Sequence, residues 1–367
     1  MVTETKANLY TMSFLHSELT FQLEEAISLG SIFDFFGTHF VIKREASDHA
    51  LARITVTNNN DYFNDIDFSA GEEVYLRKSA SDFFTIPAKR VSLGETVYFQ
   101  CSKTNTYIAM NSTNGTIVIA TPWENVEREE LVLIELIRDL VLKNEENHGV
   151  VVLHATCSYH DGKANLIIGP KGAGKSTTLL ELVSKLGHQF MSGDKTFLWV
   201  KEGQLYASGW PDYPHLGLGT LSKYPEFVGE FGLADEIDAA QETLWSTDHK
   251  RAIPPAVFKS MIPHVPAGFV APVGAFIYPK LEPSEHSVIT QLDNHVSLMV
   301  PHIERMFGEK GPAKRWNEFV KPGNLDEIDN MIEQCKTVAY ELPAFEITGS
   351  GVLTSHNFLD GGVISYE

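Results

Sequence analysis

Residues 165–183 read NLIIGPKGAGKSTTLLELV, and this stretch decides the fold. Gly169, Gly174, Lys175 and Ser176 satisfy the pattern G-x-x-x-x-G-K-[ST], in which a loop joins an apolar strand to a helix. Glycines let successive backbone N–H groups turn inward around phosphates, and the helix N-terminus adds partial positive charge. The pattern predicts a nucleotide phosphate site. Its alternative is a strand–helix turn that matches by chance.

Each position of this loop has an expected role toward ATP and Mg²⁺. Lys175 would reach the β- and γ-phosphates, the Ser176 hydroxyl would ligate Mg²⁺, and Thr177 would contact the α-phosphate. The predicted cradle comprises Gly169, Pro170, Lys171, Gly172, Ala173, Gly174, Lys175, Ser176 and Thr177.

The segments around the loop predict both strands and helices. Residues 149–168 read as two strands joined by Asp161-Gly162, because a tight hairpin turn needs positive φ. A helix is expected from Lys175 to Leu186, ended by Gly187. Further strands are expected within residues 188–210, 274–281 and 338–348, and a helix over 324–335 with Asn324 as its cap.

Residues 1–120 predict a separate β-rich module. Short runs rich in Val, Ile, Tyr and Thr recur at 39–44, 50–57, 72–79, 95–102, 106–112 and 115–121, separated by turn signals. They carry no catalytic motif, which favours a small antiparallel sheet for recognition or packing. Residues 121–147 predict a linking helix with a Thr121/Glu124 capping box and Pro122 at its first position.

These segments together predict an α/β protein with two folded parts. The expected organisation is an N-terminal β-rich α+β domain (1–120), the linking helix, a phosphate-loop domain with a mixed sheet (148–345) and a tail (346–367).

Composition narrows the class of protein. The 367 residues are 43% hydrophobic and 21% charged, which is typical of a globular chain, and no apolar run approaches the ~20 residues of a membrane span. A net charge of −19 argues against nucleic-acid and anionic-membrane partners. The N-terminus lacks signal-peptide features, and three widely spaced cysteines (Cys101, Cys157 and Cys335) indicate reduced thiols, so we expect a cytoplasmic protein.

Signatures of several phosphate-loop classes are missing. The chain has neither the Leu-Ser-Gly-Gly-Gln of transporter ATPases nor the Asn-Lys-x-Asp of GTPases. Asp194, in FMSGDKTFLWV, lies on the strand expected directly after the loop helix, where a carboxylate could face Mg²⁺ and the γ-phosphate. Asp194 is therefore a candidate metal ligand, catalytic base or both, and its alternative is an ordinary turn residue.

Four stretches of this region carry a family resemblance: the hairpin strand with LHA, the Asp-Gly turn, GPKGAGKST and GHQFMSGDKTFLW. Together they resemble the HPr kinase/phosphorylase-like group, which is related in fold to phosphoenolpyruvate carboxykinases. The resemblance covers roughly residues 148–345 and implies a kinase. It implies that His154 lies near the reacting phosphate and that Asp194 matches one aspartate of an Asp-Asp pair. Gly193 stands where the other aspartate would be, and no convincing HPr-binding signature is present. The group also implies possible homo-oligomers.

Three further groups of residues have both functional and structural interpretations. His154, Cys157 and His160 are spaced so that Cys157 points away from the two histidines on a strand, which argues against a zinc site. Lys250 and Arg251 are either cations for a transferring phosphoryl group or solvated loop charges. Residues 210–213 (Trp-Pro-Asp-Tyr) are candidates for an acceptor or adenine pocket.

The sequence thus favours an ATP-dependent kinase that transfers the γ-phosphoryl group to a hydroxyl of a small metabolite, a natural-product intermediate or a peptide Ser. Lys175, Asp194 and His154 are the expected catalytic residues, and Ser176 and Asp194 the expected Mg²⁺ ligands. The alternative is a nucleotide-binding regulatory or assembly protein with little transfer activity. A carboxykinase-like reaction is disfavoured because the extra metal-binding His and Lys are not found.

Overall fold

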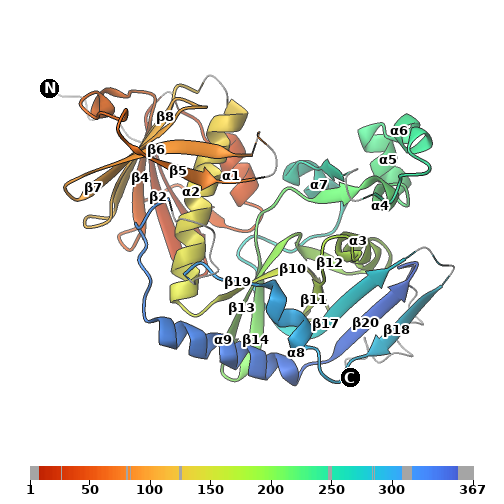
Figure 1. The fold of residues 1–367 in the computed structure, drawn as a ribbon. Helices are drawn as coiled ribbons and strands as arrows, with labels where there is room; N and C mark the ends of the chain where they lie inside the picture. Colours follow the sequence, from red (N-terminus) through yellow and green to blue (C-terminus); the bar gives the residue numbers. More distant parts are fainter. Residues whose placement is uncertain are drawn as a thin grey trace. The chain divides into compact units, whose positions relative to one another are not determined.

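The computed structural model describes residues 8–25, 27–79, 82, 84–123, 126–246, 250–282, 284, 286–307 and 316–353. The chain is an α/β protein that divides into two compact units, each built on a mixed β-sheet (Figure 1). The first unit comprises Met1–His148 and Arg305–Ile328, and the second Gly149–Glu304 and Asp329–Glu367. The helix expected as a linker and a segment inside the expected 148–345 domain thus group with the first unit.

The first unit is one sheet with the strand order β3-β1-β2-β4-β9-β8-β7-β6-β5. Its strands are β1 (Asn8–Phe14), β2 (Ser17–Leu23), β3 (Val41–Lys43), β4 (Ala52–Thr57), β5 (Glu72–Arg77), β6 (Ile86–Leu93), β7 (Thr96–Cys101), β8 (Thr106–Asn111) and β9 (Thr116–Ala120), and its helices are α1 (Gly30–Phe36), η1 (Asp61–Phe63) and α2 (Val126–Asn147). The pairs β2–β4 and β4–β9 are parallel. The expectation of an antiparallel sheet is therefore wrong, because long connections return the chain in the same direction.

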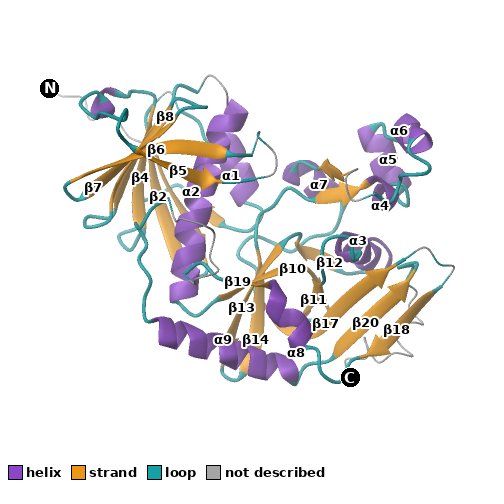
Figure 2. Ribbon diagram, viewed as in Figure 1, coloured by secondary structure: helices purple, strands orange, loops and turns teal. Residues whose placement is uncertain are grey.

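Helix α2 is an integral part of this first unit (Figure 2). Its apolar face is buried, and the buried Glu145 near its end accepts hydrogen bonds from the Ser17 hydroxyl (2.6 Å) and the His16 backbone N–H (3.0 Å). Glu124 of the expected capping box lies outside the described residues, and Pro122 precedes the first helical residue, Val126.

The second unit contains both strands and helices, as the sequence predicts. Its strands are β10 (Val151–His160), β11 (Lys163–Ile168), β12 (Gln189–Ser192), β13 (Lys195–Lys201), β14 (Gln204–Gly209), β15 (His215–Gly217), β16 (Lys250–Ala252), β17 (Ala271–Leu281), β18 (Ser287–Gln291), β19 (Ile303–Glu304) and β20 (Ala344–Gly349), and its helices are α3 (Lys175–Lys185), α4 (Leu218–Leu221), α5 (Pro225–Phe231), α6 (Ala234–Ala239), α7 (Pro255–Met261), α8 (Val296–Met299), η2 (Val300–His302) and most of α9 (Leu325–Tyr340). The hairpin turn has positive φ at Asp161 (45°) and Gly162 (80°), as expected.

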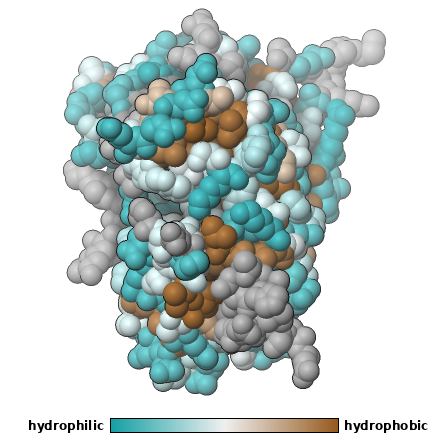
Figure 3. Space-filling view, turned by 90° about the vertical axis from the view of Figure 1, so that its right-hand side faces the viewer, coloured by the Kyte–Doolittle hydropathy of each residue, from teal (hydrophilic) through white to brown (hydrophobic). Residues whose placement is uncertain are grey.

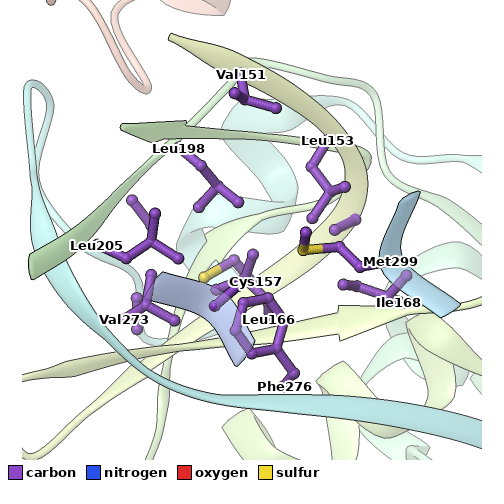
Figure 4. Close-up of a cluster of buried hydrophobic side chains, with 14 of the residues drawn as sticks. Val151, Leu153, Cys157, Leu166, Ile168, Leu198, Leu205, Val273, Phe276 and Met299 are labelled. Atoms are coloured by element: carbon purple, nitrogen blue, oxygen red, sulfur yellow. The ribbon is translucent and has the colours of Figure 1, made fainter. Parts of the chain in front are cut away.

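Five strands of the second unit pair in a closed ring. The strands β11, β10, β13, β14 and β17 pair in that order, and β11 also pairs with β17, in parallel. Leu166 and Ile168 of β11 point into the apolar cluster that these strands enclose (Figure 4), whereas Ile167 packs with α3 on the opposite face. This alternation follows from the two-residue period of a strand, and it places α3 on the face of the sheet opposite the enclosed cluster.

The end of α9 differs from the sequence prediction. The expected strand over 338–348 begins only at Ala344, because α9 continues to Tyr340 and buries Ala339 completely. The expected cap is confirmed, since the Asn324 side-chain oxygen accepts a hydrogen bond from the Asp326 N–H (3.1 Å).

On the face in Figure 3, hydrophobic side chains form several areas that lie among hydrophilic ones. Within the described part of the chain, no helix is both long enough and apolar enough to span a bilayer.

Candidate phosphate-binding site

Residues 169–174, called here the glycine loop, join the end of β11 to the start of α3. Gly172 and Gly174 have φ of +89° and +102°, a region that side chains disfavour. A Cβ on Gly174 would also lie 2.4 Å from the Leu281 side chain. The Leu281 N–H in turn donates to the Ala173 carbonyl (3.1 Å), so the end of β17 holds the loop in place. Glycine is therefore required at position 174.

The geometry of the glycine loop fits a polyphosphate. Gly174 is the N-cap of the eleven-residue α3 and supplies no side-chain cap, so no capping side chain covers the amides of the first turn. Pro170, Lys171 and Gly172 are exposed, and Ser176 is half-buried in that first turn. An anion placed here would meet backbone N–H groups and the positive end of the helix dipole.

The Lys175 side chain folds back over the loop. Its Nζ donates to the carbonyls of Gly169 (2.6 Å) and Pro170 (3.3 Å). Burial lowers the pKa of Lys175, whereas the nearby Asp194 carboxylate raises it and Lys250 lowers it. The ammonium group is thus held at the loop, within electrostatic reach of Asp194.

A second lysine reaches the same place from β16. Burial lowers the pKa of Lys250, the charge of Lys171 lowers it further, and Asp194 opposes this shift. Asp194 is thus within electrostatic range of both Lys175 and Lys250, and Lys171 is within range of Lys250. Arg251, the neighbouring candidate cation, instead pairs with Glu236 on the surface.

Strand register explains why His154 lies beside the loop. On one edge of β10, Ala155 is opposite Ile168, the last residue before the glycine loop. On the other edge, His154 is opposite Lys195, the residue after Asp194. His154 therefore stands between the loop and the turn that carries Asp194, although the three segments are separate in sequence.

Four charged or titratable groups meet at this point. His154 Nδ1 lies 3.6 Å from Asp194 Oδ1 and 3.6 Å from Glu304 Oε1. Lys195, whose side chain is only 7% exposed, donates to both Glu304 oxygens (2.5 and 2.6 Å) and lies 3.8 Å from Asp194 Oδ2. The Asp194 carboxylate, a candidate base, thus lies next to the His154 imidazole and the Lys195 ammonium group, at the edge of the glycine loop.

His302 connects this network to a cavity beside the loop. Its ring lies 6.4 Å from that of His154 at an interplanar angle of 28°. Burial lowers the pKa of His302, and the charges of Lys175 and His154 lower it further. The cavity, of about 400 Å³, is lined by His302, Tyr278, Leu281 and residues of the glycine loop. This volume is typical of sites for small molecules.

Several other predicted residues have packing roles. The Thr177 hydroxyl is buried 2.7 Å from the Thr220 hydroxyl of α4, so it is engaged away from solvent. Cys157 is buried in the core, as expected, and burial raises the pKa of its thiol. Trp210 is buried and stacks on Phe197, 5.3 Å between ring centroids. In the described ranges, no three or more His, Cys, Asp or Glu residues form a metal-binding group by themselves.

Sequence patterns did not reveal Glu304, Lys195 or His302 as parts of the site. Glu304 pairs with Lys195 across 109 residues, and β19, which carries Glu304, is only two residues long. In the sequence, Lys195 is notable only because it follows Asp194 directly. No local signal marks any of the three.

Comparison with known proteins gives little independent information. No protein-family model matches this chain, and no curated protein matches its sequence. A solved structure with some similarity is the Hpr(Ser) kinase/phosphatase from Coxiella burnetii, with 17% identity over 38% of this chain and 70% of that chain, and a TM-score of 0.22. A TM-score this low carries no argument about function, which has to be inferred from the residues of the site.

Proposed function

We propose that this protein is an ATP-dependent phosphotransferase that transfers the γ-phosphoryl group to a hydroxyl of a small metabolite, a natural-product intermediate or a peptide Ser. The convergence of Lys175, His154 and Asp194 at the glycine loop carries the proposal. Catalysis of phosphoryl transfer is mostly positioning and electrostatics, and this site offers both.

The glycine loop and the lysines would bind the nucleotide. Backbone N–H groups of residues 171–176 would surround the β- and γ-phosphates, and Lys175 would exchange its carbonyl partners for phosphate oxygens. Lys250 and Lys171 would add positive charge on the side of Asp194. Ser176 and Asp194 would hold Mg²⁺, which when bound would neutralise charge on the phosphates.

Asp194 and His154 would handle the proton of the acceptor. The acceptor oxygen forms a bond to the γ-phosphorus as the bond to the bridging oxygen breaks, and the electron pair leaves on ADP. The hydroxyl proton would pass to the Asp194 carboxylate, beside which lie His154 Nδ1 (3.6 Å) and Lys195 Nζ (3.8 Å). The cavity lined by His302 offers room for a small molecule beside the loop.

Incubation with γ-labelled ATP, Mg²⁺ and host extract tests the proposal. Label should appear on a hydroxyl compound with wild-type protein. Lys175→Ala should lower the rate by several orders of magnitude, and the exposed Lys201→Ala should leave it unchanged. Wild-type turnover by Lys175→Ala would refute this mechanism. Tight nucleotide binding without transfer would instead support a nucleotide-dependent regulatory protein.

A further inference from the structure

The cavity beside the glycine loop has a lining made mostly of apolar side chains. Leu298 lies at its rim and is 39% exposed, whereas Ile168 is completely buried. A ligand that fills the cavity therefore gains binding free energy chiefly by removing apolar surface from water. The side chains that supply the apolar surface are those of Ile168, Pro170, Ala173, Pro279, Leu281 and Leu298.

The hydroxyl of Tyr278, another lining residue, is already engaged in the core. His295 Nε2 lies 2.9 Å from the Ala339 carbonyl oxygen, which can only accept, so Nε2 carries the proton and Nδ1 is an acceptor. The Tyr278 hydroxyl, 2.9 Å from Nδ1, therefore donates to it. Both residues are almost fully buried, and His295 is not part of the lining. Tyr278 thus offers the cavity its ring and not its hydroxyl.

The charges of the lining disfavour an anionic ligand. Among the described residues that line the cavity, Lys280 is the one cationic side chain, and it forms an ion pair with Glu346. Glu282 adds a carboxylate and is exposed. A carboxylic acid or a sugar phosphate would lose its hydration here and would meet a charge of its own sign.

The backbone of the lining offers few hydrogen-bond donors. Pro279 has no N–H, the Leu281 N–H donates to the Ala173 carbonyl (3.1 Å), and the Glu282 N–H donates to the Gly349 carbonyl (2.9 Å). A sugar or a peptide segment carries several polar groups, and each one buried without a partner weakens binding. This lining therefore suits a ligand with few polar groups.

His302 supplies a polar end to the cavity, on the side of the transfer site. Its ring lies 6.4 Å from that of His154, whose Nδ1 is 3.6 Å from Asp194. Burial and the charges of Lys175 and His154 lower the pKa of His302, so the ring is neutral at pH 7 and one of its nitrogens can accept a hydrogen bond. A hydroxyl at this end would lie next to the network that contains Asp194.

We propose that this cavity binds the phosphoryl acceptor, and that the acceptor is an uncharged alcohol with an apolar body. The body packs against Leu281, Leu298 and the ring of Tyr278, and the hydroxyl lies at His302. This assignment rests on the proposed phosphotransferase function and selects among its acceptors, since it disfavours sugars, charged metabolites and a peptide Ser.

A series of alcohols of increasing length tests the assignment. The full chain, with Mg²⁺ and a non-hydrolysable ATP analogue, is titrated with 1-butanol, 1-pentanol, 1-hexanol and 1-heptanol, and binding is followed by saturation-transfer NMR. Because burial of one methylene is worth about fourfold in affinity, the dissociation constant should fall about fourfold per added carbon until the cavity is full. In parallel, γ-labelled ATP is supplied with the same alcohols and with glycerol, glucose and N-acetylserinamide, and label should appear mainly on the longer alcohols.

Two tryptophan variants show where the alcohols bind. Leu298→Trp fills the rim of the cavity and should weaken 1-heptanol binding at least about tenfold while changing 1-butanol binding much less. Val270→Trp is the matched control, since Val270 is also 39% exposed but precedes β17, whose other end lines the cavity. It should bind both alcohols as wild type does. Should Leu298→Trp not fold, Leu298→Ala serves and should weaken 1-heptanol binding at least about fourfold.

The outcomes separate this assignment from the proposed function. An affinity that does not depend on chain length, or an equal loss in the Leu298 and Val270 variants, overturns the assignment. Label that appears mainly on glycerol, glucose or N-acetylserinamide also overturns it and leaves the phosphotransferase function standing. Alcohols that bind as expected but accept no label would overturn the proposed function, and not the class of ligand that the cavity binds.

Discussion

The imidazole Nδ1 of His154 lies 3.6 Å from the Asp194 carboxylate, at the edge of the glycine loop. His154 lies on β10, and Asp194 lies in the turn that leads into β13 rather than on the expected strand. Strand register places His154 opposite Lys195, the residue after Asp194, so the pairing of β10 with β13 brings the two side chains together.

Replacement of His154 should affect the transfer step more than nucleotide binding. His154→Gln removes the titratable ring beside Asp194, so we expect kcat to fall by roughly 10²–10⁴-fold while the affinity for ATP changes little. Steady-state kinetics and calorimetric ATP titration measure the two effects. His160→Gln, at the other end of the same strand, is the matched control and should retain wild-type kcat. Equal activity of the two variants would remove His154 from the reaction.

The glycine loop should not tolerate a side chain at Gly174. Gly174→Ala places a Cβ 2.4 Å from Leu281 at a φ of +102°, so it should lower stability by more than the ~1–2 kcal/mol of a left-handed residue and weaken nucleotide binding. Gly162→Ala has a φ of +80° but no atom within 4 Å, so it should cost only the conformational part and leave binding intact. Thermal unfolding and nucleotide titration compare the two, and wild-type binding by Gly174→Ala would contradict the role of the loop.

The Lys195–Glu304 pair should stabilise the second unit. Glu304→Gln leaves the nearly buried Lys195 ammonium with a weaker partner, so the free energy of unfolding should fall by about 1.5–3 kcal/mol. The double variant Lys195→Met/Glu304→Gln should be more stable than the sum of the single effects predicts, because no charge is left unpaired. Urea unfolding of the four proteins gives the coupling energy. Strict additivity would show that the pair contributes nothing.

Stability should fall as the pH drops below the usual histidine range. Burial, and then the charge of His160, lower the pKa of His188 from 6.5 to about 3. The residue is 1% exposed, and its Nδ1 lies 3.0 Å from the Ser158 hydroxyl. Between these values the unfolded chain binds a proton that the folded chain does not, so His188 should remove about 1.4 kcal/mol of stability per pH unit as pH falls from about 6.5 to 3.

Urea unfolding at several pH values between 4 and 7 measures this slope. His188→Gln should reduce the slope by one proton, whereas Ser158→Ala keeps the buried histidine and should keep the slope. A His188→Gln protein with the wild-type slope would assign the proton uptake to other groups.

Local features of the second unit were predictable because they depend on neighbouring residues. The Asp161-Gly162 turn, the glycine loop, α3 and the Asn324 cap each follow from residues within a few positions. Three strands of the first unit were missed (β1, β2 and β6), because alternation alone does not identify a strand. Its parallel pairs were missed because the strands that pair are separated in sequence by other strands.

In the candidate site, too, local features were predictable and distant contacts were not. The sequence motif identified Lys175 and Ser176 as candidates, and the place of Asp194 after the loop helix identified Asp194. The positions of Glu304 and His302 depend on β10, β13 and β19 lying side by side, which no local pattern records.

By itself, the sequence determined where backbone amides can cradle a phosphate, because glycine positions and helix start are local properties of the chain. Only the tertiary structure decided which charges surround that cradle. Their positions depend on hydrogen-bond register between strands and on contacts between residues as far apart as Lys195 and Glu304.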